Sequence, residues 1–222
     1  MSKLFYSGPP PEIIGAVKAT TPATTTSASG TTLVIPKPAG VRHNDLMIAH
    51  IQLDNFLTNN IIAPSGWTQI LNELGLCFVY TKRASDSEPS EYTWTVGITG
   101  RARTGVMVAV RYGVLGDVAI TSGAPLICPT VMTGVMRGAL FIGGVSFPRA
   151  TNTESISADS PLTLAVQHVA NGTAAYAIPY ASALGYQSNL GPNEPVANRS
   201  FTSAGGTSGT AFTSSLILNP EG

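Results

Sequence analysis

The sequence predicts an all-β protein, built as a single antiparallel β-sandwich of jelly-roll or immunoglobulin-like type with an extended N-terminal arm. Three observations lead to this fold class. The 222 residues include 23 glycines and 16 prolines, which break the chain too often for long helices. Short apolar runs rich in β-branched and aromatic residues recur between these breaks. A hydrophobic content of 43% supplies enough apolar surface to offset the entropy lost on folding.

The segment 1–32 is interpreted as an arm followed by a linker or an edge strand. Residues 1–12 contain an aromatic pair and a run of three prolines at 9–11, whose fixed backbone angles favour an extended chain. A frayed end is the alternative, because termini are commonly disordered unless they are docked. Residues 19–32 form a Thr/Ser/Ala tract without periodic apolar residues.

The segment 33–222 is predicted to be one β-sandwich domain, because its composition does not shift again. Residues 45–53 read DLMIAHIQL, and their alternation predicts a strand. One set of alternating side chains in this strand is expected to face a core: Met47, Ala49, Ile51 and Leu53.

The remaining strands follow from shorter patterns. Residues 104–114 and 138–147 are apolar enough to be buried central strands, and their interior glycines and valines disfavour a helix. No internal repeat is evident. Further strands are predicted at 33–35, 67–71, 76–80, 92–96, 162–169, 174–178 and 214–218.

The charge pattern excludes two classes of partner. Lys and Arg together number 12, Asp and Glu together number 12, and charged residues make up only 11% of the chain. Nucleic-acid and anionic-membrane proteins need clustered cations, and no such cluster is present. The longest apolar runs are about half the length of a membrane-spanning helix, so membrane insertion is not expected. The first 11 residues also lack the pattern of a signal peptide.

The search for catalytic, metal and cofactor motifs is negative. The sequence contains no GxSxG, SxxK, HExxH or nucleotide-binding glycine pattern, so neither an enzyme nor a cofactor is predicted. A catalytic triad assembled from distant positions stays open. Cys77 and Cys128 are interpreted as buried free thiols. The three histidines, His43, His50 and His168, are interpreted as structural or surface residues.

Two further groups of residues have competing interpretations. The acidic residues Asp86, Glu88 and Glu91 suit a solvated hairpin loop better than a calcium site, because no DxDxDG pattern is present. Trp67 and Trp94 lie within strand patterns and are expected to be core or half-buried. Tyr180 and Tyr186 flank a glycine-bearing loop and are the candidates for an exposed aromatic contact surface, for example for a glycan.

Seven segments, taken in order, carry a resemblance to a known family. They are 34–40 (VIPKPAG), 44–49 (NDLMIA), 63–70 (APSGWTQI), 79–84 (VYTKRA), 88–95 (EPSEYTWT), 105–114 (GVMVAVRYGV) and 215–220 (SLILNP). Their residues have architectural roles: Asp45 suits a tight turn, and the turn at 64–66 directs Trp67 inward. The string resembles a β-sandwich module that recurs in tailed-bacteriophage virion proteins and in some bacterial surface proteins.

The resemblance implies a non-enzymatic structural protein located in the virion and made in the cytoplasm of a bacterial host. No repeats or coiled-coil stretches surround the module, which favours a capsid decoration or head-fibre protein that forms a homotrimer and stabilises neighbouring major capsid or tail subunits. The alternative is a tail-fibre or baseplate adhesin that binds a host-surface glycan; a depolymerase enzyme is a third class. The arm residues expected to dock on other virion proteins are Leu4, Phe5, Tyr6, Pro9, Pro10, Pro11, Ile13 and Ile14.

Overall fold

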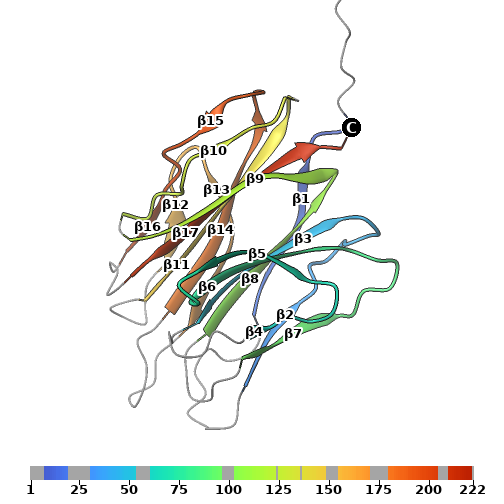
Figure 1. The fold of residues 1–222 in the computed structure, drawn as a ribbon, viewed down its shortest axis with the longest axis vertical. Helices are drawn as coiled ribbons and strands as arrows, with labels where there is room; N and C mark the ends of the chain where they lie inside the picture. The colour runs from blue at the N-terminus through green and yellow to red at the C-terminus, as the bar shows by residue number, and fades with distance from the viewer. Residues whose placement is uncertain are drawn as a thin grey trace, which may run out of the picture.

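The computed structural model describes residues 8–19, 31–53, 61–96, 103–123, 125–135, 137–148, 155–170, 180–204 and 210–221. Within these ranges the chain forms antiparallel β-sheets and contains no helix (Figure 1). The prediction of an all-β, antiparallel sandwich is confirmed, and the described strands add layers that the sequence did not reveal. The strand predicted at 174–178 and the arm residues Leu4, Phe5 and Tyr6 lie outside the described residues.

The N-terminal half forms two sheets. The larger one, called the first central sheet, has the order β1-β8-β3-β6-β5. The smaller one, called the first outer sheet, has the order β2-β7-β4 and packs on one face of the larger. The strands of this half are β1 (Glu12–Lys18), β2 (Thr32–Pro36), β3 (Leu46–Leu53), β4 (Ile61–Ile62), β5 (Thr68–Glu73), β6 (Cys77–Arg83), β7 (Glu91–Val96) and β8 (Arg103–Arg111).

The C-terminal half has the same plan. Its five-stranded sheet, called the second central sheet, has the order β13-β14-β11-β17-β9, and two short outer ribbons, β10-β15 and β12-β16, pack on its far face. The strands of this half are β9 (Gly113–Ser122), β10 (Val131–Met132), β11 (Ala139–Pro148), β12 (Ile156–Ala158), β13 (Thr163–Ala170), β14 (Tyr180–Leu190), β15 (Pro195–Val196), β16 (Phe201–Ser203) and β17 (Phe212–Pro220).

The strand order is duplicated between the two halves. If the strands of each half are numbered along the chain, the first central sheet β1-β8-β3-β6-β5 has its strands in the order first, last, third, sixth and fifth. Read from its other edge, the second central sheet runs β9-β17-β11-β14-β13, which is the same sequence of positions. The outer strand β7 of the first half corresponds to two short strands, β15 and β16, in the second. The repeat therefore exists in topology although the residues do not repeat.

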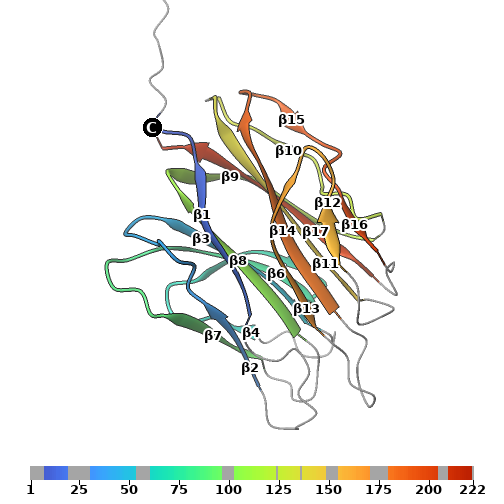
Figure 2. The same cartoon turned by 180° about the vertical axis from the view of Figure 1, so that it is seen from behind.

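The two central sheets pack face to face, and this arrangement produces four layers (Figures 1 and 2). The core between them contains Ile48 and Val108 from one half and Ile142 and Leu216 from the other. A second core lies between the first central and first outer sheets, and a third lies under the outer ribbons. Each central sheet is therefore covered on both faces.

Strand β3 is buried on both of its faces. The predicted core set Met47, Ala49, Ile51 and Leu53 faces the first outer sheet, as expected. The alternate side chains of β3, expected to be the less buried set, are buried as well, because the second central sheet covers them. β11 is buried along its whole length for the same reason, which confirms the prediction of a central strand there.

The predicted strand at 104–114 is divided into two. β8 ends at Arg111, Tyr112 has a φ of 60°, and β9 begins at Gly113 in the other central sheet. The left-handed backbone at Tyr112 redirects the chain, and a pattern of apolar residues does not reveal such a break. One residue thus joins the two halves.

Local turns follow the sequence closely. The Asp45 carboxylate accepts a hydrogen bond of 2.6 Å from the backbone N–H of Arg42, which confirms its role in the turn before β3. The backbone N–H of Trp67 donates to the carbonyl of Pro64, and Gly66 has a φ of 82° within that turn. The indole of Trp67 is consequently buried, as is that of Trp94.

Candidate functional site

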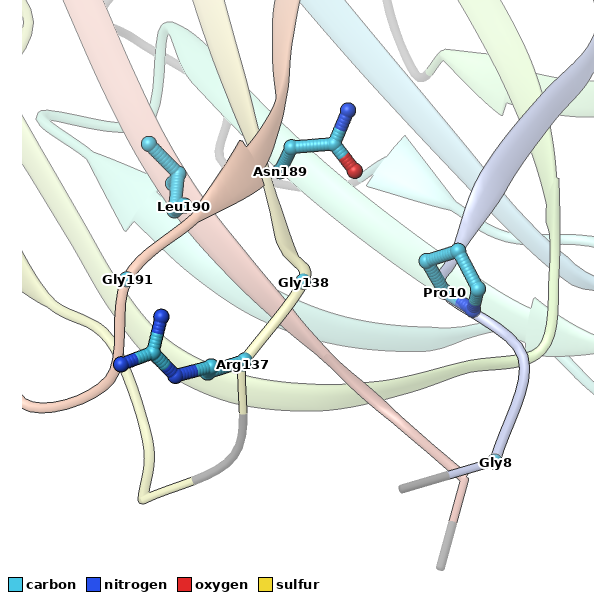
Figure 3. Close-up of a pocket in the computed structure, with 7 residues that line it drawn as sticks. All are labelled: Gly8, Pro10, Arg137, Gly138, Asn189, Leu190 and Gly191. Atoms are coloured by element: carbon cyan, nitrogen blue, oxygen red, sulfur yellow. The ribbon is translucent and has the colours of Figure 1, made fainter. Parts of the chain in front are cut away.

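The base of the predicted arm lies at the end of the molecule where the described C-terminal residues also lie (Figures 1 and 3). A Cβ atom added to Gly8 would overlap the carbonyl oxygen of Glu221, so these two backbones touch. Pro9 and Pro10 are exposed, and Pro11 is buried. Pro10 borders a groove of about 340 Å³ that it shares with Arg137, Asn189 and Leu190, among others.

Ile13 and Ile14 lie inside the folded unit. They belong to β1, which pairs with β8 and forms an edge of the first central sheet. Ile13 packs against the core between the central sheets, and Ile14 packs against the core under the first outer sheet. Residues 12–18, assigned to the arm from the sequence, therefore form an edge strand of the fold, and these two side chains make contacts within the chain.

The two tyrosines proposed as a contact surface do not stand as an exposed pair in the described structure. Tyr186 is partly buried and packs against the core between the central sheets. The backbone of Tyr180 begins β14, and its side chain lies outside the described residues.

An exposed apolar patch lies close to the arm base, and the sequence analysis did not identify it. We call Val114, Met132 and Val135 the terminal apolar patch; their side chains are 43%, 47% and 78% exposed. Asn219 connects them, because Val114 pairs with Asn219 in register and Asn219 Oδ1 accepts a hydrogen bond of 3.1 Å from the backbone N–H of Gly134. Tyr112, two residues before Val114, is also exposed, and its carbonyl accepts a hydrogen bond from the N–H of Glu221.

Two exposed carboxylates flank this patch. Asp117 accepts a hydrogen bond of 2.9 Å from the backbone N–H of Met132, and the backbone of Glu194 pairs with Thr133. Neither carboxylate forms an ion pair with any described residue. The border of the patch therefore carries two carboxylates, and the exposed cation Arg137 lies two residues beyond Val135, beside the groove at Pro10.

A histidine and a cysteine meet in the core between the two central sheets. His50 Nε2 lies 2.8 Å from Cys77 Sγ and 3.1 Å from Ser146 Oγ. Ser146 Oγ is also 2.9 Å from Ser182 Oγ, which contacts Thr104 Oγ1. The chain of contacts crosses the interface, since Cys77 and Thr104 come from one half and the two serines come from the other.

The geometry of this polar seam resembles a nucleophile with a base, but its electrostatics do not support catalysis. Burial lowers the pKa of His50 to about 4 and raises the pKa of the Cys77 thiol far above its usual range. A catalytic cysteine needs a thiolate and access to substrate, whereas here both partners are neutral and fully buried. The seam is thus a structural polar network that connects the two halves.

His168 and His43 occupy different surroundings. His168 is buried, its Nδ1 lies 3.4 Å from the backbone N–H of Gly105, and burial together with the nearby Lys18 lowers its pKa to about 4. His43 is exposed, with Nδ1 3.3 Å from the Asp86 carboxylate. His168 is therefore a structural histidine and His43 a surface histidine, as the sequence indicated.

The acidic segment before β7 is partly solvated and partly structural. Asp86 and Glu91 are exposed, as expected for a hairpin loop. Glu88 differs, because its side chain is only 2% exposed and accepts hydrogen bonds of 2.7 Å from Lys82 and from Tyr92. Burial raises the pKa of Glu88, but hydrogen bonds from Lys82, Ser85 and Tyr92 outweigh it and bring the pKa to about 2. Glu88 therefore holds the loop between β6 and β7 to both of these strands, through Lys82 and Tyr92.

Arg103 is an unusual buried cation. It is 2% exposed at the start of β8, and none of its three guanidinium nitrogens has a hydrogen-bond partner among the described residues. Burial lowers its pKa.

The described residues offer no metal centre and no membrane-spanning helix. No group of three or more His, Cys, Asp or Glu side chains gathers within the ranges that the structure covers. No helix long and apolar enough to cross a bilayer is found among them. Cys77 and Cys128 are free and buried, which confirms their interpretation as thiols.

Comparison of the chain with protein-family models, with curated proteins and with solved structures gave no match.

Proposed function

We propose that this protein is a non-enzymatic structural protein of a bacteriophage virion, of the capsid-decoration or head-fibre kind, that binds and stabilises neighbouring virion subunits. The observation that carries the proposal is the position of the terminal apolar patch beside the base of the arm. Apolar side chains held on a rigid scaffold suit stable contacts with another protein, because burying their surface on contact is favourable.

The distribution of reactive side chains supports a binding role over a catalytic one. In the described residues the His50–Cys77 pair is neutral and inaccessible, and the buried carboxylate of Glu88 is engaged by four hydrogen bonds. Two central sheets, each covered on both faces, also give a stiff body, which lowers the entropy cost of binding.

The strand order adds an argument by analogy. We interpret the order repeated in each half as that of a jelly roll, in which eight strands form two sheets. Viral capsid domains and lectin domains both use this architecture. The first supports the virion assignment, and the second keeps a glycan-binding adhesin of the tail fibre or baseplate as the alternative; fold analogy alone does not separate them.

Deletion of residues 1–7 tests the anchoring arm. The deletion stops before Pro9 because β1 begins at Glu12, and a cut at residue 14 would remove part of a sheet. We expect the truncated protein to fold with an unchanged thermal transition and to disappear from purified particles. Full occupancy on particles after the deletion would contradict the anchoring role.

A glycan array separates the two candidates. The virion proposal expects co-purification with particles and no glycan affinity. Specific glycan binding by the isolated chain, abolished by changes at an exposed surface, would favour the adhesin.

A further inference from the structure

We propose that residues 1–7 of one copy dock on the terminal apolar patch of a second copy, so that the protein self-associates by exchanging N-terminal arms. The inference deepens the proposed function, because it names the partner surface for the arm and the contact that holds a homo-oligomer together.

The chemistry of the two surfaces is complementary. The segment 1–7 reads MSKLFYS and carries three large apolar side chains at 4–6 together with one cation, Lys3. The acceptor patch offers Val114, Met132 and Val135, which are exposed. Asp117 and Glu194 border it without an ion-pair partner among the described residues, so Lys3 meets negative charge at the rim.

The position of the arm base favours this contact. Gly8 lies against the carbonyl of Glu221, whose N–H donates to Tyr112 beside the patch, so the arm leaves the molecule at the end that also bears the acceptor. Seven residues extend to roughly 24 Å at about 3.4 Å each, which is enough to cross an interface between two such ends.

The proline run fixes the point from which residues 1–7 leave the molecule. Three consecutive prolines at 9–11 favour an extended backbone, and Pro10 lies against Gly138 on the wall of the groove in Figure 3. Because Pro11 is buried and Pro9 and Pro10 are exposed, residues 1–7 start at the surface of the molecule, within reach of a second copy. Donor and acceptor at one end are compatible with a closed symmetric ring, such as the expected trimer.

Sedimentation velocity of the full chain and of matched variants tests the contact. We expect the full chain to form an oligomer, and both the deletion of residues 1–7 and the change Val135→Asp to give monomers. Ile62→Asp is the control, because Ile62 is 65% exposed on β4 in the first outer sheet and outside the patch. Circular dichroism melts should show all variants folded, since the altered side chains are exposed.

Complementation distinguishes exchange between copies from docking within one chain. The Val135→Asp variant keeps its arm and lacks an acceptor, whereas the truncated variant keeps its acceptor and lacks an arm. Mixed together, the two should form a complex that neither forms alone, detected by fluorescence anisotropy with the Val135→Asp chain labelled. A second test pairs Lys3→Glu, which should weaken association, with Glu194→Lys, which should restore it in the double variant.

Four results would overturn the inference: a monomeric full chain, an unchanged oligomer after the deletion, equal behaviour of Val135→Asp and Ile62→Asp, or no complex in the mixture. The virion role is read separately from occupancy on particles. A monomer that still decorates particles would remove arm exchange and leave the proposed function intact, whereas an arm-exchanged oligomer absent from particles would do the reverse.

Discussion

Individual residues at the interface between the central sheets couple this fold to pH. His50 is fully buried and neutral, and its partners Cys77 and Ser146 are neutral as well. In the unfolded chain a histidine has a pKa near 6.5, while burial holds that of His50 at about 4. As the pH falls below 6.5, the unfolded state binds a proton that the folded state rejects, so stability is lost down to about pH 4.

We predict that the free energy of unfolding falls between pH 6.5 and 4.5, with His50 responsible for about 2–3 kcal/mol of the loss. Urea titrations of the variant His50→Gln should show a correspondingly flatter pH dependence, and His43→Gln, at an exposed site, should match the native protein. Glu88 removes stability only below about pH 4.5, and buried His168, whose pKa is also lowered to about 4, adds the same slope to both proteins. Equal slopes for the native protein and His50→Gln would refute this role.

At the scale of the elements, one glycine sets the approach of the two central sheets. A Cβ added to Gly144 of β11 would overlap the ring of His50 from β3 and crowd Ser214 of β17. The ring cannot retreat, because it lies in a packed interface.

We therefore expect Gly144→Ala to destabilise the protein by about 1–3 kcal/mol, the usual effect of overpacking a core. Thermal denaturation measures it, and Gly123→Ala tests whether the effect is local. Gly123 has open space around its Cβ position but a φ of 123°, so its variant reports backbone strain alone. A Gly144→Ala protein as stable as the native one would mean that the sheets are not held this closely.

The elements also show how far the sequence carries a prediction. Alternation in 45–53 identified the side chains that face the first outer sheet, because that signal is local. Coverage of the opposite face depends on β11 and β17, which lie far along the chain, so no local pattern contains it. The break at Tyr112 was missed for a related reason: a left-handed residue between two apolar strands leaves the hydrophobic pattern unbroken.

The candidate sites were less predictable than the strands. Cys77 and His50 are 27 residues apart and meet only because β3 pairs with β6. Val114, Met132 and Val135 are brought near one another by the pairing of β9 with β17 and by the hydrogen bonds of Asn219 to Gly134 and of Asp117 to Met132. Buried thiols and core tryptophans were correctly predicted, because those residue types have strong preferences of their own.

For the whole molecule, the shared core between the halves implies one cooperative unit. Each half presents a large apolar face, including Val106 and Val110 in one and Leu140 and Leu218 in the other, and each face is covered only by the partner half. An uncovered face of this kind favours aggregation.

We predict that the intact chain unfolds in a single calorimetric transition and that residues 1–112 or 113–222, expressed alone, give no soluble folded protein. The two pieces produced together should associate and recover the melting behaviour of the intact chain, within the loss caused by cutting the connection. Two separate transitions, or a stable isolated half, would contradict this view of the interface.

The order of synthesis gives the face-to-face packing a further consequence. The ribosome completes the first half while about 110 residues are still to be added, which takes roughly 5–20 s at 5–20 residues per second. During that time the nascent sheet β1-β8-β3-β6-β5 has no cover on one side. Chaperones that bind exposed apolar surfaces of nascent chains are therefore expected to bind this face during translation and to release it once β17 has emerged.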